Sequence, residues 1–524
     1  MTPRRRFFAW LALAAAALTS IPAAAASHPL RDGCDRYRRL AGNATAGVSD
    51  ASRGSGPLRV FAIQYKQQAA YATTYQTFAA KMDCLMRDYV VPHLDRSKTN
   101  LVVFNEDIGL ATLATGSRGA QARALAASPV PGSTPEIQDA AGAPLGGAVA
   151  LGSIAATYQK QMLDVQRRFP GTDPRKAIML AATDTFVRGF STTFSRLARK
   201  YGVWMVASNN QGEFDYSTDP ADVSTWADPD LTAAYATGRI KGVWVPRTGQ
   251  AWNNGFLWAP YDLHSPRGAS SANPASPEYD PDTNLLYTNR KTPLTQIEKD
   301  FLALDEGDMS EANTGPVQIP GLDGFKFGFA ISLPAFRFGN DFGEEFEGNP
   351  CASPNSWMRC LHERGVNTIL QPEANPGPWA RYGADGGNFQ SLTWGASTLR
   401  IVTDPTVPGF RYVICPHMTG NLVDLPFDGQ SAILERGRTG AGRAYVGAKD
   451  FIPETDSAWA MPYAGLKPEF VALAPWVIDD DHSLTPTENR NRLHQRATQM
   501  MAGSLSEHSN GYLETAIFAD LAAP

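Results

Sequence analysis

Apolar residues along the chain gather in short runs rather than in long stretches. Eight runs of six to eight residues have the composition of buried strands, and they lie at 58–65, 99–106, 202–208, 254–260, 325–332, 366–372, 411–417 and 430–435. Runs of this length, bounded by polar or turn residues, are typical of strands. The run at 99–106, TNLVVFNE, is apolar through its centre instead of alternating, so we expect cover on both of its faces.

A different spacing marks two helices. Between 71 and 89, and again between 186 and 201, large apolar residues recur every three or four positions, as on one face of a helix. A further helix is predicted near 155–168, and a polar one around 486–502. Strands that alternate with helices predict an α/β layered fold around one central β core.

The first 26 residues are set apart from the rest of the chain. Three arginines (Arg4, Arg5 and Arg6) precede an apolar segment that ends in Ala24-Ala25-Ala26, an A-x-A cleavage site. This pattern predicts a signal peptide, of either the twin-arginine or the general secretory type. We therefore expect a secreted or periplasmic protein.

The remaining chain is organised around one long domain. A polar leader is expected at 27–57, a single domain at 58–450, and a C-terminal extension packed on that domain at 451–524. Three polar or Ala/Gly-rich insertions interrupt the domain, at about 110–175, 209–250 and 265–285. Long insertions of this kind are commonly lids, binding loops or mobile surface.

Charge and hydropathy exclude two classes of partner. The signal segment holds three of the 47 basic residues and none of the 52 acidic ones, so the rest of the chain carries a net charge of about −8. Without basic clusters, such a chain is not expected to bind nucleic acid. After residue 26, no stretch is apolar for long enough to predict a membrane span.

Export permits disulfides, and the chain has five cysteines. Cys351 and Cys360 bracket a short loop and form the best candidate pair. Cys34 and Cys84 are a second pair that nothing further in the sequence supports. One cysteine is left over.

The fifth cysteine, Cys415, lies in the apolar run RYVIC, where a buried and inert thiol is expected. His417 follows two residues later. On an extended strand these two side chains share a face, so a catalytic Cys/His pair is an alternative.

Three residues at strand ends or in loops are candidates for chemistry. Glu106 ends the strand LVVFNE, where a carboxylate is either a solvated strand end or a general base. Lys291 lies in LLYTNRKTPLTQIEKDF, where surface solvation is the alternative. Ser332 ends FGFAIS, where capping a turn is the alternative. The eight histidines show no metal-ligand spacing, and no phosphate-binding glycine loop is present, so we expect no metal and no cofactor.

Taken in order, these motifs resemble the carbon–nitrogen hydrolase (nitrilase) superfamily. The matching segments are LRVFAIQY, NLVVFNEDIGL with Glu106, FSRLARKYGVWMVAS, YTNRKTPLTQIE with Lys291 and Glu298 seven residues apart, GFAIS, ILQPEANPGPW and DGQSAIL. The resemblance runs from about 58 to 450. It implies an αββα sandwich, here with long insertions, and commonly a homodimer.

The resemblance also implies roles for the site residues. Glu106 would act as general base, Lys291 would stabilise the developing anion, and Glu298 would support Lys291 or relay a proton. In the family a cysteine attacks a nitrile or amide carbon, because a thiol is readily ionised by a neighbouring base. The ligand implied is a small amide-like molecule.

The nucleophile position departs from the family pattern. Ser332 stands where the cysteine is expected, Leu333 and Pro334 replace the aspartate and aromatic residue that follow it, and Asn105 replaces a proline. A serine hydroxyl ionises far less readily than a thiol, and serine nucleophiles usually have a histidine or lysine base.

Three functions are therefore open from the sequence. The first is an exported hydrolase of non-peptide carbon–nitrogen bonds, in amides or nitriles, that uses Ser332 in place of cysteine. The second is a secreted binding protein that keeps the scaffold and has lost catalysis. The third is an acyltransferase that uses the same acyl-enzyme chemistry.

Overall fold

The computed structural model of the chain describes residues 33–41, 47–127, 145–339, 348–375, 390–423, 425–427, 429–438, 470–475, 488 and 512–524. The predicted signal peptide lies outside these residues. So does the polar helix predicted around 486–502, apart from residue 488.

The larger sheet is built on three neighbouring parallel strands, β2 (Leu58–Gln67), β3 (Thr99–Val103) and β4 (Trp204–Gln211). On one side of these, β16 pairs antiparallel with β2, and β1 pairs parallel with β16. On the other side, β7 and β8 follow β4 in antiparallel succession, while β12 pairs with β2 and β13 with β12. The bounds of these added strands are β1 Val48–Ser52, β7 Trp252–Trp258, β8 Leu285–Arg290, β12 Met418–Leu422, β13 Leu425–Phe427 and β16 Thr515–Leu521.

The second sheet has the strand order β15-β14-β11-β10-β9. Its strands β9, β10 and β11 are parallel, whereas β14 and β15 are antiparallel to their neighbours. The bounds are β9 Phe327–Phe329, β10 Thr368–Leu370, β11 Tyr412–Cys415, β14 Ala432–Glu435 and β15 Phe470–Leu473.

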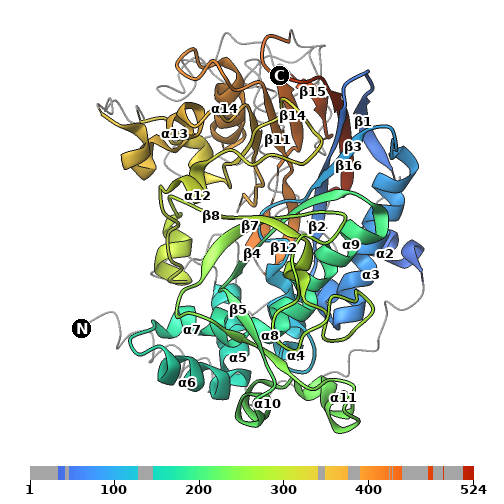
Figure 1. Cartoon of the computed structure of the whole chain (residues 1–524), viewed down its shortest axis with the longest axis vertical. Coiled ribbons are helices and arrows are strands. Elements are labelled where there is room, and N and C mark those ends of the chain that lie inside the picture. The colour runs from blue at the N-terminus through green and yellow to red at the C-terminus, as the bar shows by residue number, and fades with distance from the viewer. Residues whose placement is uncertain are drawn as a thin grey trace.

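The two sheets face each other across a shared apolar core. Along β2, Val60 and Ala62 point into this core, where they join Phe329 of the second sheet, and Phe61 points to the opposite face. Helices α3 and α9 cover that outer face, and α13 and α14 cover the outer face of the second sheet (Figure 1). The layers therefore run helix, sheet, sheet, helix, and the predicted α/β fold with its αββα arrangement is confirmed.

The helices of the described residues fall into two groups, those on the sandwich and those in the insertions. On the sandwich and its edges are α2 Cys34–Ala41, α3 Tyr75–Leu85, α8 Thr183–Phe186, α9 Thr192–Tyr201, α12 Glu311–Thr314, α13 Trp357–Glu363 and α14 Gln390–Thr403. In and around the insertions are α4 Ala120–Ala127, α5 Leu145–Thr157, α6 Gln159–Arg168, α7 Pro174–Ala181, α10 Pro220–Trp226 and α11 Thr232–Ala236.

The first two insertions contain more regular structure than their composition predicts. The helices α4, α5 and α6 lie within 110–175, and the antiparallel pair of β5 (Phe214–Ser217) and β6 (Val243–Pro246) lies within 209–250. These helices, with α7, bury a separate apolar cluster that includes Leu125, Ile154 and Val165. The insertions are therefore a packed layer and not only loops.

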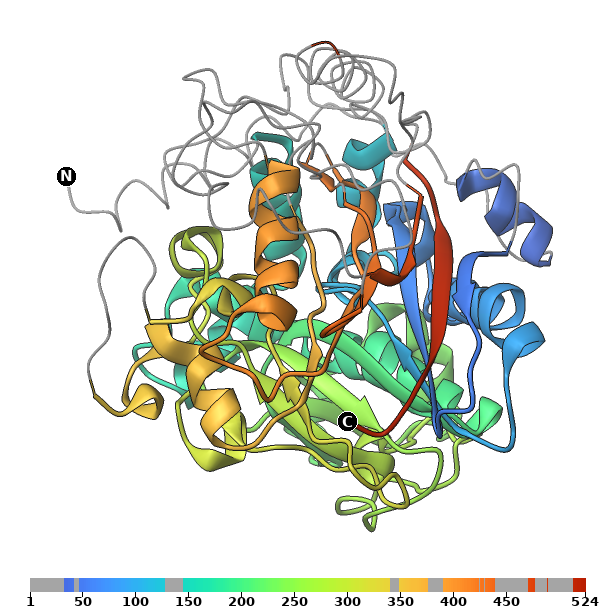
Figure 2. The ribbon, with the colours of Figure 1, turned by 90° about the horizontal axis from the view of Figure 1, so that it is seen from above.

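All eight predicted strands are present, with ends that differ by a few residues. The polar leader and the C-terminal extension hold strands that were not predicted, namely β1, β15 and β16. Strand β16 lies inside the larger sheet, between β1 and β2 (Figure 2). Strand β15 is an edge strand of the second sheet, so the described part of the extension contributes one strand to each sheet. No helix of the described residues is long and apolar enough to cross a membrane.

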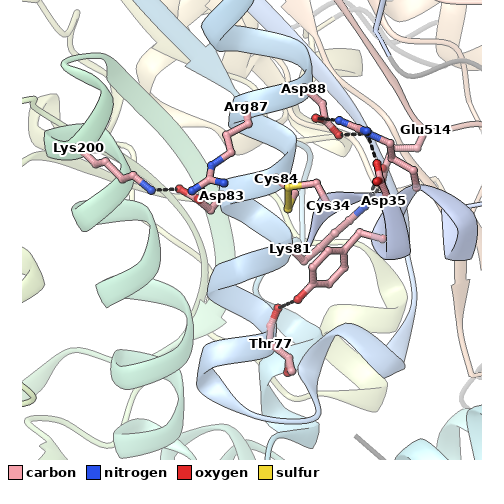
Figure 3. Close-up of a disulfide and its surroundings, with 12 residues drawn as sticks. Cys34, Asp35, Thr77, Lys81, Asp83, Cys84, Arg87, Asp88, Lys200 and Glu514 are labelled. Atoms are coloured by element: carbon pink, nitrogen blue, oxygen red, sulfur yellow. Dashed lines mark hydrogen bonds and ion pairs between the residues drawn. A yellow bond between two sulfur atoms is a disulfide. The ribbon is translucent and has the colours of Figure 1, made fainter. Parts of the chain in front are cut away.

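Both predicted cysteine pairs are disulfides in the structure. Cys34 is bonded to Cys84 across 50 residues, which ties α2 to α3 (Figure 3). Cys351 is bonded to Cys360 across nine residues. Cys415 is the buried free cysteine.

The two disulfides are expected to differ in what they contribute to stability. In the chain-entropy description a crosslink that closes a 50-residue loop stabilises by about 1.5 kcal/mol more than one that closes nine residues. The paired substitution Cys34→Ser with Cys84→Ser should therefore lower the free energy of unfolding more than Cys351→Ser with Cys360→Ser. Urea unfolding of both variants measures this, and the reduced wild type is the control. Equal losses, or a larger loss for the short loop, would contradict it.

Candidate active site

The carboxyl ends of several strands meet at one edge of the larger sheet. Strand β3 leads directly to Glu106, and β8 leads directly to Lys291. Because β7 is antiparallel to β4 and β8 is antiparallel to β7, strand β8 runs in the same direction as β3. Both ends therefore lie on the same edge, which explains how two residues 185 positions apart in sequence come together.

At this edge Lys291 lies between two carboxylates. Its Nζ atom is 2.7 Å from Oε1 of Glu106 and 3.0 Å from Oε2 of Glu298. All three side chains are buried, with 2–4% of each residue exposed. A buried lysine is tolerated when its charge is paired in this way, since an isolated buried charge is costly.

Asn253 on β7 joins the two carboxylates. Its Nδ2 atom donates to Oε1 of Glu106 and to Oε1 of Glu298, at 2.7 Å in each case. The backbone N–H and the hydroxyl of Thr295 both donate to the other oxygen of Glu298, also at 2.7 Å. We did not predict Asn253 from the sequence, although a pair of asparagines in an otherwise apolar strand is a signal that could have been used.

The two carboxylates differ in proton affinity. Burial alone would raise the pKa of Glu298, but Lys291 and the surrounding hydrogen-bond donors outweigh burial and hold this pKa below its usual value. Burial raises the pKa of Glu106 in spite of Lys291, and the negative charge of Glu298 adds to this effect. Burial by itself would lower the pKa of Lys291, yet the paired carboxylates raise it above its usual value. Glu298 is therefore the counter-ion of Lys291, and Glu106 is the better proton acceptor.

Ser332 occupies a strained turn just after β9. Its backbone has φ 61° and ψ −112°, and residues Leu333–Phe336 continue from it as a short 3-10 helix. Left-handed φ values are unfavourable for residues with a side chain, and they concentrate at functional sites. A strained turn from a strand into a helix is also the way in which several serine hydrolases present their nucleophile. We predicted a strand end here but not the strain.

Glu373 lies beside Ser332 and was not among the predicted site residues. Strands β9 and β10 are parallel, with Phe329 paired to Leu370, so continuing the register past their ends places Ser332 next to Glu373. Glu373 is fully buried, and its Oε1 atom accepts a hydrogen bond of 2.7 Å from Gln371. Burial raises the pKa of Glu373 well above its usual value, the charge of Glu106 adds to this, and the hydroxyl of Ser332 opposes it.

The structure thus brings three of the four predicted site residues into direct contact, namely Glu106, Lys291 and Glu298. Ser332 is connected to them through two consecutive residues. Glu373 lies beside Ser332, and the backbone N–H of the next residue, 374, donates to Oε2 of Glu106 at 3.1 Å. Among the described residues, no hydrogen bond joins the Ser332 hydroxyl to Glu106 or Lys291.

The alternative Cys/His pair is also present as a contact. The Sγ atom of Cys415 lies 3.5 Å from Nε2 of His417, and both residues are buried. Burial raises the pKa of the Cys415 thiol well above its usual value and lowers the pKa of His417 to about 3. Both groups are therefore uncharged at neutral pH. An activated cysteine needs a lowered thiol pKa and a charged or basic histidine beside it, so this pair has the properties of a structural contact.

Comparison with known proteins gives remote structural similarity only. No family model matches the chain, and no curated protein matches it. Among solved structures, a carbon–nitrogen hydrolase from Helicobacter pylori G27 aligns over 72% of this chain and 81% of its own, with 11% identity and a TM-score of 0.35. An amidase of the nitrilase superfamily from Nesterenkonia sp. AN1 aligns over 84% and 98%, with 12% identity and a TM-score of 0.32. Similarity at this level assigns no role to any residue of this chain.

Proposed function

We propose that this protein is an exported hydrolase of amide-like carbon–nitrogen bonds with Ser332 as its nucleophile. One observation carries the proposal: a buried lysine is held between two carboxylates, at the edge of the sandwich where a serine occupies a strained turn. Buried charged groups with shifted pKa values and residues with a strained backbone both concentrate at functional sites.

The chemistry follows from the groups present. The Oγ atom of Ser332 attacks the carbonyl carbon, and Glu106 acts as general base. The former carbonyl oxygen becomes negatively charged and is stabilised by Lys291, which uses two of its three N–H donors on Glu106 and Glu298. The carbon–nitrogen bond then breaks and the amine leaves with one proton. Water hydrolyses the resulting ester, releases the acid and returns a proton to Ser332.

Export is supported by the two disulfides, since such bonds persist in oxidising compartments. The predicted signal peptide and its twin-arginine or general secretory type remain predictions. Amino-terminal sequencing of the protein recovered from the periplasm or the medium tests them, with cleavage after residue 26 as the expected result.

Hydrolysis should depend on the Ser332 hydroxyl. We expect the wild type to release ammonia or amine from at least one member of a panel of propionamide, butyramide, benzamide and their nitriles. Ser332→Ala should lose this activity at least 100-fold, because it removes the oxygen that attacks the carbonyl carbon. Ser153→Ala is a matched control, because Ser153 is a buried serine that bonds only within its own helix. Equal turnover in wild type and Ser332→Ala would contradict the proposal.

A catalytically inactive binding protein is the second candidate. The observation that favours it is that the Ser332 hydroxyl makes no hydrogen bond to Glu106 or Lys291 among the described residues. It predicts that a member of the amide panel raises the melting temperature of the wild type without being consumed. Hydrolysis that appears only in Ser332→Cys would favour this candidate, and hydrolysis by the wild type would exclude it.

A further inference from the structure

Three residues form a row across the carboxyl ends of the second sheet. Past the end of β9 the parallel register places Ser332 beside Glu373, and a β-bridge pairs Glu373 with His417 past the end of β11. The parallel strands β9, β10 and β11 therefore present a serine, a glutamate and a histidine side by side. The proposed function uses neither Glu373 nor His417, and of these two Glu373 is the one next to Ser332.

The oxygens of Glu106 and Glu373 are occupied very differently. In Glu106, Oε1 accepts from Lys291 and Asn253, and Oε2 accepts from a backbone N–H. Turning Glu106 toward the serine would break a buried ion pair. In Glu373, Oε1 accepts from Gln371, whereas Oε2 is buried and accepts no hydrogen bond from the described residues. The carboxyl of Glu373 thus has an oxygen that no other described donor occupies, and the Ser332 hydroxyl is close enough to lower the pKa of this group.

The groups facing Glu373 set its charge. Glu106 lies close enough to disfavour its ionised form, Lys291 partly compensates, and the neighbouring Cys415 and His417 are uncharged at neutral pH. A carboxylate in this environment is a stronger base than one in water. This property matters for a serine, whose hydroxyl needs a stronger base than a thiol does.

We propose that Glu373 is the general base for the Ser332 hydroxyl. This inference rests on the proposed function and moves the proton of Ser332 from Glu106 to Glu373. As Oγ forms its bond to the carbonyl carbon, the O–H bond breaks and the proton passes to Oε2 of Glu373. The amine takes this proton as the carbon–nitrogen bond breaks, which returns Glu373 to a carboxylate. Glu106 then accepts the proton of the water that cleaves the ester, and this proton passes on to Oγ as the acid leaves, which restores both the Ser332 hydroxyl and the Glu106 carboxylate.

The proposal has a test that does not depend on finding the substrate. An alkyl phosphonofluoridate forms a bond between its phosphorus and Oγ of Ser332, releases fluoride and needs the serine proton to be removed. We expect the full-length wild type to be labelled at Ser332, as located by mass spectrometry of the labelled peptide. The rate should rise with pH as Glu373 ionises. Glu373→Gln should label at least 100-fold more slowly, with a rate that no longer depends on this ionisation.

Three further proteins make the comparison specific. Glu373→Asp keeps the carboxylate and should retain more labelling than Glu373→Gln, even though its side chain is shorter. Glu106→Gln should slow labelling less than Glu373→Gln does. Glu311→Gln removes an exposed glutamate and should label like the wild type. The melting temperature of each variant shows whether it is folded. If a variant does not fold, the pH dependence of labelling in the wild type still tests the role of Glu373.

The outcomes separate this inference from the proposed function. The role of Glu373 is overturned if Glu373→Gln is labelled as fast as the wild type, or if the labelling rate of the wild type does not vary with pH. In either case, hydrolysis of an amide by the wild type would still support the proposed function. Labelling slowed by Glu373→Gln without hydrolysis of any amide or nitrile in the panel supports the Glu373–Ser332 pair and overturns the proposed function. A wild type that is neither labelled nor active overturns both.

Discussion

Lys291→Met is expected to lower the free energy of unfolding by about 3–5 kcal/mol, because it leaves two buried carboxylates without their counter-ion. Glu106 and Glu298 both lie within 3.0 Å of the Nζ atom, and both are buried. Methionine fills a similar volume, so the loss reports on charge more than on packing. The same substitution should abolish hydrolysis, since the oxyanion then has no cation beside it.

The pH dependence of this loss has a definite sign. Lys291 lowers the pKa of Glu298 in the folded protein, so this carboxylate stabilises the wild type above its unfolded pKa and the stabilisation is lost as the pH falls. Without Lys291, burial raises the pKa of both carboxyls, and the variant is helped by acid, which neutralises them. The difference between wild type and Lys291→Met should therefore shrink between pH 7 and pH 4. Urea unfolding at several pH values measures this.

Two controls test the explanation. Lys299→Met removes a lysine whose 2.6 Å pair with Glu306 lies at the surface, and should cost no more than about 1 kcal/mol. Adding Glu106→Gln to Lys291→Met removes one of the two unpaired charges and should recover part of the lost stability. A Lys291→Met variant as stable as the wild type at pH 7 would refute the account of the buried triad.

The sequence predicted the parts of the fold that are continuous and apolar. Strands such as β2 and β3 are covered on both faces, so their central residues, 60–63 and 101–103, are apolar without interruption, and this was enough to find them. Strand β8 is half-buried along most of its length and has the mixed sequence LLYTNR, which gives no such signal. Strand β16 is fully apolar at its centre, but its place between β1 and β2 depends on a pairing over more than 450 residues. Patterns within a short window do not contain that information.

The candidate site, like the fold, could be predicted from the sequence only in part. The position of Glu106 at the end of an apolar strand marked it as a candidate. Glu373 follows the apolar strand β10 in the same way, but we did not predict it as a site residue. Asn253 is a different case, because its importance comes from the two carboxylates that it touches. Such a role depends on three distant segments meeting. The catalytic roles of Glu106, Lys291, Glu298 and Ser332 stay predictions.

Acid is expected to destabilise the protein through His417. Burial lowers the pKa of this imidazole to about 3, against 6.5 for an exposed histidine. A side chain at position 429 would collide with its Nδ1 atom, which shows how closely the chain surrounds the ring. The folded state holds the ring neutral, so its contribution to stability is fully present above pH 6.5 and is lost as the pH falls toward 3. The full difference corresponds to roughly 5 kcal/mol, of which about 3 kcal/mol is lost by pH 4.

His417→Gln separates this effect from the other groups that titrate in acid. The variant is expected to be less stable than the wild type at pH 7, because it loses the packing of the ring. From pH 7 to pH 4, however, it should lose about 3 kcal/mol less than the wild type does, since glutamine takes up no proton. His264→Gln, at an exposed histidine, should follow the wild type throughout. Urea unfolding at pH 7, 5.5 and 4 gives the three curves. Parallel curves for wild type and His417→Gln would show that the ring is protonated in the folded state, and that the Cys415–His417 contact is open to water.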